Sequence, residues 1–239
     1  MRRAGGSRNG TWEMFDGIAA RYDLLNRVLS FGRDRAWRRA LARQVRIRSG
    51  LRVLDAATGT GDVLAAVAGE HREIGLGVGW DMAGAMLGIA RRKFARLGFD
   101  DRLAPARGDA QRVAFPDETF DAVTIAFGIR NVQDVGMALR EFHRVLKPGG
   151  QLLTLEFSIP DNRLIRRMYL FYFRHILPFV GGIVSSDREA YRYLNHSVES
   201  FPYGEAFCAR IRAAGFVGVR RRPLTWGIAM LYLGEKPGA

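Results

Sequence analysis

The sequence has only one cysteine, Cys208, among its 239 residues. A single cysteine excludes an internal disulfide, which suits a reducing compartment. No run of about 18 uncharged apolar residues occurs, so the sequence predicts no membrane-spanning helix. The N-terminus also lacks the apolar segment of a secretory signal peptide. These absences together predict a cytoplasmic location.

Metal ligands are equally sparse. The four histidines (His71, His143, His175 and His196) are scattered along the chain, and none has a neighbouring cysteine. Structural and catalytic metal sites need three or four such ligands at short spacings. We therefore expect chemistry without a metal.

Lysine is rare too, with three residues against 34 arginines, yet the net charge is +13. Residues 1–50 contribute +8 of this charge, from 12 arginines and four acidic residues. Such a surplus suits nucleic acid or the anionic face of a phospholipid membrane. A basic surface that only contacts solvent explains the charge equally well.

Strand and helix patterns alternate through most of the chain, which predicts an α/β fold with a doubly wound, mainly parallel sheet of seven strands. Residues 1–11 read as a disordered tail, followed by a single domain over 12–239. Within it, residues 12–48 are expected to form N-terminal helices, with Trp37, Leu41 and Val45 buried beside Ala36 and Ala40. Residues 160–200 interrupt the alternation and read as a helical lid. The expected strands are 51–56, 74–80, 102–107, 120–127, 151–157, 217–222 and 227–233, and the expected helices between them are 62–68, 83–97, 135–146 and 203–214.

A glycine turn follows the first strand, where Asp55 precedes Gly59-Thr60-Gly61. Glycine lets a backbone approach a ligand closely. An acidic residue before the turn and Asp81 at the next strand end suit a ligand that carries both an ammonium group and a ribose. S-adenosylmethionine (SAM) is such a ligand, whereas a dinucleotide site wants a third glycine where Leu64 stands. The turn therefore predicts a SAM-dependent methyltransferase.

The remaining cofactor contacts follow from the topology, because ligands of such sheets lie beyond the carboxyl ends of the strands. Asp55 is expected near the methionine ammonium and Asp81 near the ribose hydroxyls. Asp109, followed by Ala110, could accept from the adenine amino group, and Met82 could pack on the ring. A turn or cap built by Asp109 alone is the competing interpretation.

Two longer stretches, residues 22–37 and 144–158, indicate which kind of methyltransferase this is. With residues 127–131 and 191–194, they resemble the quinone-biosynthesis C-methyltransferases, and the resemblance extends from about Phe15 to Leu233. Asp34 departs from that family, which usually has histidine there, and Ala126 stands where serine is frequent. The resemblance implies a class I methyltransferase sheet and C-methylation of a polyprenyl quinol, most simply demethylmenaquinol to menaquinol.

Arg130 and Asn131 stand just past the fourth strand, where the substrate must approach. An always-charged guanidinium suits a phenolate, so Arg130 would stabilise the phenolate of the quinol directly or through water. Tyr22 and Asp187 are further candidates near the same opening. Tyr191, Tyr193 and His175 are other candidates. Packing of lid helices would also explain Tyr22 and Tyr191, and a structural role would explain His175. An insoluble prenyl tail would bring residues 163–184 to the inner face of a membrane, although plain packing on the sheet would explain their apolar character too.

Several alternatives stay open at this point. A ubiquinone-pathway or dual-substrate benzoquinol enzyme has the same fold, as does a methyltransferase for another small molecule. Outside these enzymes stand a basic nucleic-acid-binding module and a scaffold of a biosynthetic complex. The missing Pro-Pro-aromatic motif after the fourth strand argues against a base-modifying enzyme, and we expect no nucleic-acid partner. The sequence leaves homodimer formation open.

Overall fold

We analysed a computed structural model of the chain, which describes Asp16, Arg27, Ser30, residues 32–172, Arg174 and residues 197–238. The expectations for the tail 1–11 lie outside the described residues. The same holds for Tyr22, His175, Asp187, Tyr191 and Tyr193, and for much of the expected lid.

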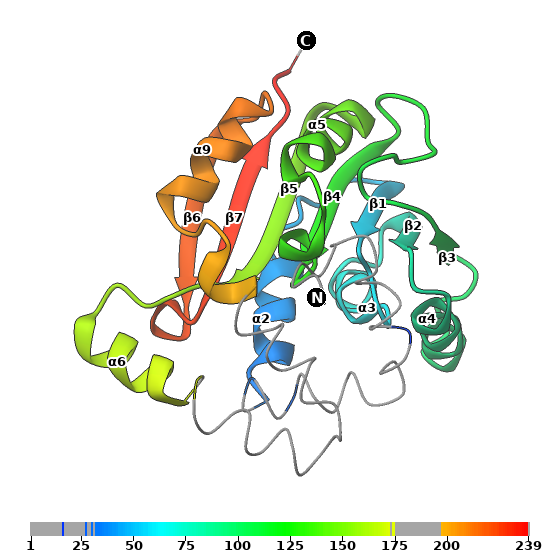
Figure 1. The fold of residues 1–239 in the computed structure, drawn as a ribbon. Helices are drawn as coiled ribbons and strands as arrows, with labels where there is room; N and C mark the ends of the chain where they lie inside the picture. Colours follow the sequence, from blue (N-terminus) through cyan, green and yellow to red (C-terminus); the bar gives the residue numbers. More distant parts are fainter. Residues whose placement is uncertain are drawn as a thin grey trace, which may run out of the picture.

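The fold is built on a seven-stranded sheet with the order β3-β2-β1-β4-β5-β7-β6. Strands β1 to β5 pair in parallel, while β7 runs antiparallel to both β5 and β6. This topology confirms the predicted doubly wound, mainly parallel sheet (Figure 1). The strands are β1 Leu51–Ala56, β2 Ile74–Asp81, β3 Leu103–Arg107, β4 Phe120–Ala126, β5 Leu146–Phe157, β6 Val217–Leu224 and β7 Ala229–Glu235.

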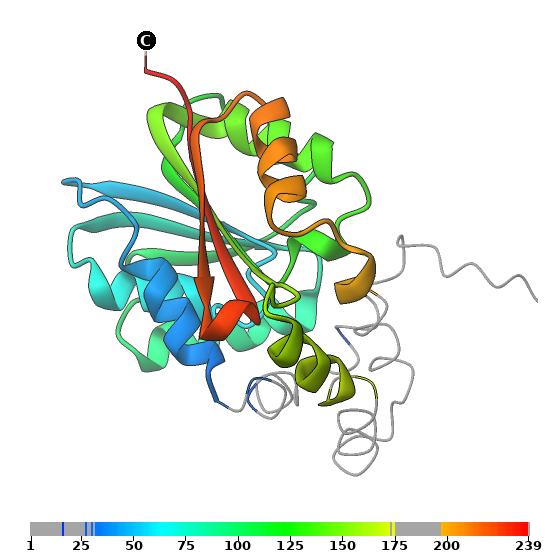
Figure 2. The same ribbon diagram turned by 90° about the vertical axis from the view of Figure 1, so that its left-hand side faces the viewer.

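Helices cover both faces of the sheet, so the central strands are buried on both sides. Helices α2 Asp34–Ala42, α3 Asp62–Glu70 and α4 Gly84–Arg96 pack on one face. Helices α5 Val135–Val145 and α9 Glu205–Ala213 pack on the other, as the turned view in Figure 2 shows. Burial on both faces explains the near-continuous apolar sequence of β4.

The order of the strands reverses between β1 and β4, which both pair with their neighbours in parallel. Ligands of doubly wound sheets bind beside such a switch point, at the carboxyl ends of the strands. In Figure 1 these ends lie at the lower edge of the sheet, where α6 Arg163–Phe171 also lies. The topology thus predicts a ligand site at this edge.

Two local expectations were wrong. The strand expected at 151–157 starts earlier, at Leu146, so residues 147–150 belong to β5, which shifts its register against β4 near Phe120. In α2, Ala36 is exposed and Ala40 only half-buried, whereas Asp34 and Arg38 are buried beside Trp37 and Leu41. A charged pair can face inward here because its two members bind each other.

Candidate functional site

The glycine turn between β1 and α3 has the backbone conformation that glycine favours. Gly59 and Gly61 have φ angles of 56° and 79°. A Cβ atom added to Gly61 would lie 2.6 Å from the ring of Phe94 on α4. Conformation and space therefore both require glycine at position 61.

Two residues with side chains share this left-handed conformation at the same edge. Ala57 follows β1 with φ 49°, and Phe127 follows β4 with φ 56°. A Cβ atom on Gly128 would lie 2.5 Å from Cβ of Ala57, so the two turns pack against each other. Backbone strain of this kind concentrates at functional sites. Neither residue carries a sequence signal that would have revealed it.

Asp55 is a buried carboxylate at the end of β1, with 1% of its surface exposed. Its oxygens accept hydrogen bonds from Thr58 Oγ1 at 2.5 Å and Thr124 Oγ1 at 2.6 Å. Burial raises the pKa of Asp55 to about 6, although both threonines oppose the shift. A cation at this carboxylate would recover the electrostatic free energy lost on burial. Asp55 lines a small pocket together with Arg38, Ala57, Thr58, Gly59, Thr60, Asp62, Val63 and Ala126.

Asp81, at the end of β2, is tied directly to the glycine turn. Its carboxylate accepts from the backbone N–H of Gly59 at 2.8 Å and from that of Ala83 at 2.9 Å. Burial raises the pKa of Asp81. These hydrogen bonds fix the carboxylate beside the turn, while the adjacent Met82 is 37% exposed.

Asp109 and Ala110 lie at the far side of the same edge, after β3. The Asp109 carboxylate accepts from the backbone N–H of Gln111 at 2.8 Å, which is an Asx-type turn. The Asp109 carbonyl accepts from Trp80 Nε1 at 2.9 Å, and Gly108 has no room for a side chain against the Trp80 ring. Asp109 is therefore a turn residue in this structure, as the competing interpretation expected. Its contact with adenine stays a prediction.

A network of ion pairs, which the sequence analysis missed, contacts the glycine turn. Arg38 Nη1 pairs with Asp34 at 2.5 Å and with Asp62 at 3.0 Å. Lys93 contacts Asp62 as well and donates to Thr60 Oγ1 at 3.1 Å. The network joins α2 and α4 to the first residue of α3. Asp34, where the resembled family usually has histidine, thus has a structural partner in this chain.

A second polar cluster lies beyond the ends of β4 and β5. Arg130, in the short helix η2 Ile129–Asn131, is 6% exposed, and its Nη1 lies 2.5 Å from Glu156 Oε1. The same Nη1 donates to the Phe127 carbonyl at 2.6 Å, and the guanidinium lies 5.4 Å from the centre of the Phe157 ring. Asn131 is half-buried and bonds through its backbone N–H to Gly128. Arg130 therefore lies at the predicted edge, but its charge is paired.

Glu156 is the partner that sequence reasoning missed. It has no exposed surface, and burial raises its pKa even though Arg130 opposes the shift. Glu156 Oε2, Arg130 Nε and Ser158 Oγ have no hydrogen-bond partner among the residues that the structure describes. Tyr169 of α6 lies close enough to interact electrostatically with both charges. Glu156 stands within the 144–158 stretch, which was its only sequence signal.

The edge thus holds two groups of polar residues. Asp55, the glycine turn and Asp81 come together as predicted by their spacing, and their chemistry fits SAM: one buried carboxylate for an ammonium and a second acid beside a glycine backbone. The Arg130–Glu156 pair lies farther along, past β4. No cluster of three or more potential metal ligands occurs within the described part of the chain.

Comparison with known proteins gives one consistent family. The ubiE/COQ5 methyltransferase family matches residues 4–236. A demethylmenaquinone methyltransferase of Thermus thermophilus is 49% identical over 94% of this chain and 100% of its own length. A ubiquinone/menaquinone biosynthesis C-methyltransferase of Geobacter sulfurreducens is 47% identical over 94% of this chain and 87% of its own.

Solved structures agree on the fold. A putative methyltransferase in complex with the Trm112 activator of Haloferax volcanii superposes with a TM-score of 0.67 at 22% identity, covering 93% of this chain and 97% of the other. A phosphoethanolamine N-methyltransferase of Haemonchus contortus, solved with S-adenosyl-L-methionine, gives 0.62 at 18% identity, with 84% and 52% covered. At these identities the likeness concerns the fold alone.

Proposed function

Because this chain belongs to the ubiE/COQ5 methyltransferase family, we propose that it transfers a methyl group from SAM to a ring carbon of a polyprenyl quinol. The acceptor we propose is demethylmenaquinol, the substrate class in the name of the Thermus relative. The whole length of that relative matches 94% of this chain. The proposal rests on two neighbouring groups of polar residues at one edge of the sheet. Asp55, the glycine turn and Asp81 suit SAM, and the Arg130–Glu156 pair suits a phenol.

The proposed roles at the cofactor follow from the contacts. Asp55 would hold the methionine ammonium, and Asp81 would accept from the ribose hydroxyls while it keeps the Gly59 backbone in place. Thr60 and Gly61 complete the turn, Met82 and Ala110 would flank the adenine, and Asp109 would accept from its amino group. When bound, SAM supplies an electrophilic methyl group.

The proposed role of Arg130 is to stabilise negative charge on the quinol oxygen. A guanidinium stays protonated at any physiological pH, so it acts as a donor and not as a base. It is held in place by Glu156 and by the Phe127 carbonyl, which limits its rearrangement during the reaction. Asn131 adjoins it, and Tyr22 and Asp187 stay candidates for the same opening.

Acceptor choice can be tested with purified protein, labelled SAM and two quinols in detergent, demethylmenaquinol and a benzoquinol precursor of ubiquinone. We expect a kcat/KM for the naphthoquinol at least tenfold above that for the benzoquinol. Equal values would establish a dual-substrate enzyme. Transfer to neither quinol, with SAM binding intact, would refute the proposed acceptor.

We also propose that α6 contacts the surface of an anionic membrane. Three faces run along this helix. Ile165, Tyr169 and Tyr172 turn inward, whereas Leu164, Met168 and Phe171 are 68%, 65% and 60% exposed. No helix of the described residues is long and apolar enough to cross a bilayer, so the contact would be peripheral.

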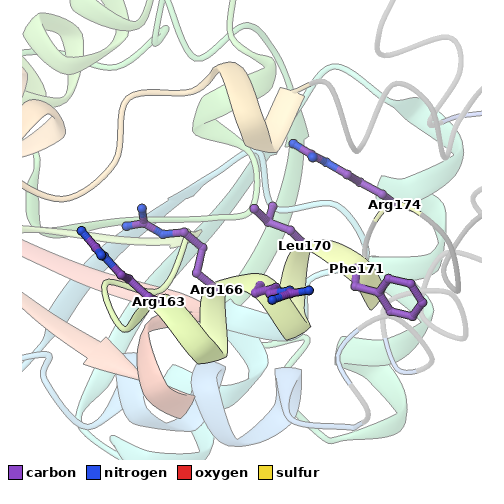
Figure 3. A pocket seen from close by; sticks show the side chains of 6 residues that line it. Arg163, Arg166, Leu170, Phe171 and Arg174 are labelled. Carbon is purple, nitrogen blue, oxygen red and sulfur yellow. The ribbon is translucent and has the colours of Figure 1, made fainter.

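Arginines line the third face of α6. Together with Leu170, Phe171 and Arg174, which lies past the end of the helix, they border a cleft of about 360 Å³, shown in Figure 3. Arg174 forms a two-pronged ion pair with Glu199, with N···O distances of 3.0 and 2.9 Å. Exposed apolar side chains beside a basic face are typical of helices that lie in a membrane interface. The arginines of the cleft are Arg163, Arg166, Arg167 and Arg174.

A further inference from the structure

We propose that the Glu156 carboxylate is the proton acceptor of the reaction, taking the hydroxyl proton of the quinol through its Oε2 atom. This inference rests on the proposed C-methylation of a quinol. It gives separate tasks to the two members of the buried pair: Arg130 stabilises the developing negative charge, and Glu156 removes the proton.

Geometry supports this assignment. Glu156 Oε1 is occupied by Arg130 at 2.5 Å and by the backbone N–H of Phe157 at 2.9 Å. The backbone N–H of Arg130 also interacts with the carboxylate. Oε2 is buried and has no hydrogen-bond partner within the described part of the chain. Buried carboxylate oxygens are nearly always hydrogen-bonded, so an exception needs an explanation. A hydroxyl donor that arrives with the substrate would supply the missing bond.

The position of Glu156 supports it too. Leu155 of β5 pairs with Ala126 of β4, so Glu156 stands at the carboxyl end of its strand, level with the turn that holds Phe127 and Arg130. This is the edge at which Asp55 and Asp81 lie. Arg130 Nε also has no hydrogen-bond partner among the described residues. Two unsatisfied polar atoms within one buried ion pair mark a place for a polar group.

Electrostatics support the same assignment. Among the described residues, Arg130 of η2, Tyr169 of α6 and Tyr232 of β7 interact electrostatically with Glu156. Arg130 is the cation of these three groups, and burial outweighs its effect, so the pKa of Glu156 lies above its ordinary value. A carboxylate with a raised pKa is a better proton acceptor near neutral pH.

The proton step balances as follows. The quinol O–H bond breaks, its electron pair stays on the oxygen, and a new O–H bond forms at Glu156 Oε2. The ring carbon thereby gains the electron density with which it bonds to the methyl group. The bond between this methyl group and the sulfur of SAM breaks at the same time, and its electron pair goes to the sulfur, so that S-adenosylhomocysteine leaves. The ring carbon then loses its own hydrogen as a proton to solvent, and Glu156 returns its proton to the oxygen. The net products are the methylated quinol, S-adenosylhomocysteine and one proton.

Access to Oε2 requires movement, because Glu156 has no exposed surface in this structure. Tyr169, on the inward face of α6, is 8% exposed and lies near the pair. We therefore place the entry of the quinol ring on the side of α6.

The test compares Glu156→Gln with Thr154→Val, a control on the same face of β5 whose buried hydroxyl also has no partner among the described residues. We expect Glu156→Gln to bind SAM as the parent does by calorimetry and to lose about 10²- to 10⁴-fold in methyl transfer at pH 7. The control should keep its activity. The loss should shrink when the acceptor ionises without help, either with a more acidic halogenated quinol or above pH of about 10, where phenols ionise.

A purely structural role predicts a loss that is the same for every acceptor and every pH, and that result would overturn the proposal. A second readout needs no turnover: the absorbance of a bound naphthol analogue should show its anion in the parent and its neutral form in Glu156→Gln. If Glu156→Gln does not fold, Glu156→Asp keeps the charge and should retain the naphtholate spectrum with a lower rate; a neutral naphthol there would contradict the proposal. A parent protein that methylates no quinol at all would refute both the proposed function and this inference.

Discussion

At the scale of single residues, the site is built from acids that are costly to bury. Asp55 has a pKa of about 6, well above that of an aspartate in an unfolded chain. The folded state therefore binds a proton more tightly than the unfolded state does. The stabilising contribution of that proton is fully present below the unfolded pKa and is lost as the pH rises through about 6.

This sign gives a prediction for Asp55→Asn, which removes the buried charge and keeps the shape. At pH 8 the free energy of unfolding of the variant should be about 2–3 kcal/mol larger than that of the parent, so the variant is the more stable protein. The difference should vanish below pH of about 4, where Asp55 is protonated in both states. Chemical denaturation at several pH values measures it. An Asp55→Asn variant less stable than the parent at pH 8 would contradict the assigned cause.

The same substitution should weaken SAM binding, because the amide cannot pair with an ammonium group. Calorimetry should show at least tenfold weaker binding for Asp55→Asn at pH 8. In the parent, affinity should decline as the pH falls below about 6. Unchanged affinity in the variant would remove Asp55 from the ammonium site.

Site residues could be predicted where local spacing in the sequence places them. They could not be predicted where contacts between distant segments bring them together. Asp55 and Asp81 could be predicted to lie at one edge because each ends a parallel strand. Glu156 could not be paired with Arg130, since 26 residues separate them and only the β4–β5 register brings them together. Tyr22 and Asp187 lie outside the described residues, so their roles stay predictions.

At the scale of elements, helix α3 carries two glycines with opposite requirements. Gly61 precedes the helix with φ 79° and faces the Phe94 ring, whereas Gly69 lies in the last turn with open space where a Cβ would stand. The turn needs Gly61 for its conformation, whereas the helix would accept a side chain at Gly69.

We therefore expect Gly61→Ala to lower the free energy of unfolding by about 2–4 kcal/mol, the sum of left-handed strain and overlap with Phe94. Gly69→Ala should raise it by about 0.5–1 kcal/mol, because alanine loses less backbone entropy in a helix. Thermal melts of the two variants provide the comparison. Equal effects would show that the turn tolerates a side chain.

Helix α6 gives the second prediction at this scale. Replacing Arg163 and Arg167 by glutamine should weaken partitioning onto phosphatidylserine vesicles by about 30-fold, since each surface arginine contributes about 1 kcal/mol. Arg91→Gln with Arg92→Gln makes the same charge change on exposed positions of α4 and should have little effect. Vesicle sedimentation at physiological salt measures both. Equal losses in the two pairs would indicate that overall charge, and not α6, governs binding.

Among the elements, α2 shows what apolar patterning leaves out. A pattern of apolar residues assigns Asp34 and Arg38 to the solvent side, but here the two residues bind each other and Asp62 and are buried. The third member of the network, Asp62, belongs to α3, so the amphipathic pattern of α2 contains no sign of it. The bounds of the central strands β1 and β4, by contrast, could be predicted to within one residue, because burial on both faces demands a nearly continuous apolar sequence.

At the scale of the whole molecule, topology explains why the two polar groups adjoin. Five parallel strands send their carboxyl ends to one edge, and the order reverses between β1 and β4. The turns after these two strands touch through Ala57 and Gly128. The proposed cofactor and quinol sites thus share a boundary that no single segment defines.

The whole molecule also carries a net charge of +13, which would attract anionic membranes at long range. Salt screens this attraction within about 10 Å at 0.1 M ionic strength. The exposed apolar residues of α6 are not affected by screening. Binding to membranes through both features should therefore weaken with salt without vanishing.

The central claim is that this chain joins a methyl group from SAM to a ring carbon of demethylmenaquinol. The most direct test uses SAM with a ¹³C-labelled methyl group and identifies the product by nuclear magnetic resonance. We predict a carbon–carbon bond between the label and the naphthoquinol ring, with both hydroxyl groups unmethylated. A label attached to oxygen, or no labelled quinol from a protein that binds SAM, would contradict the account.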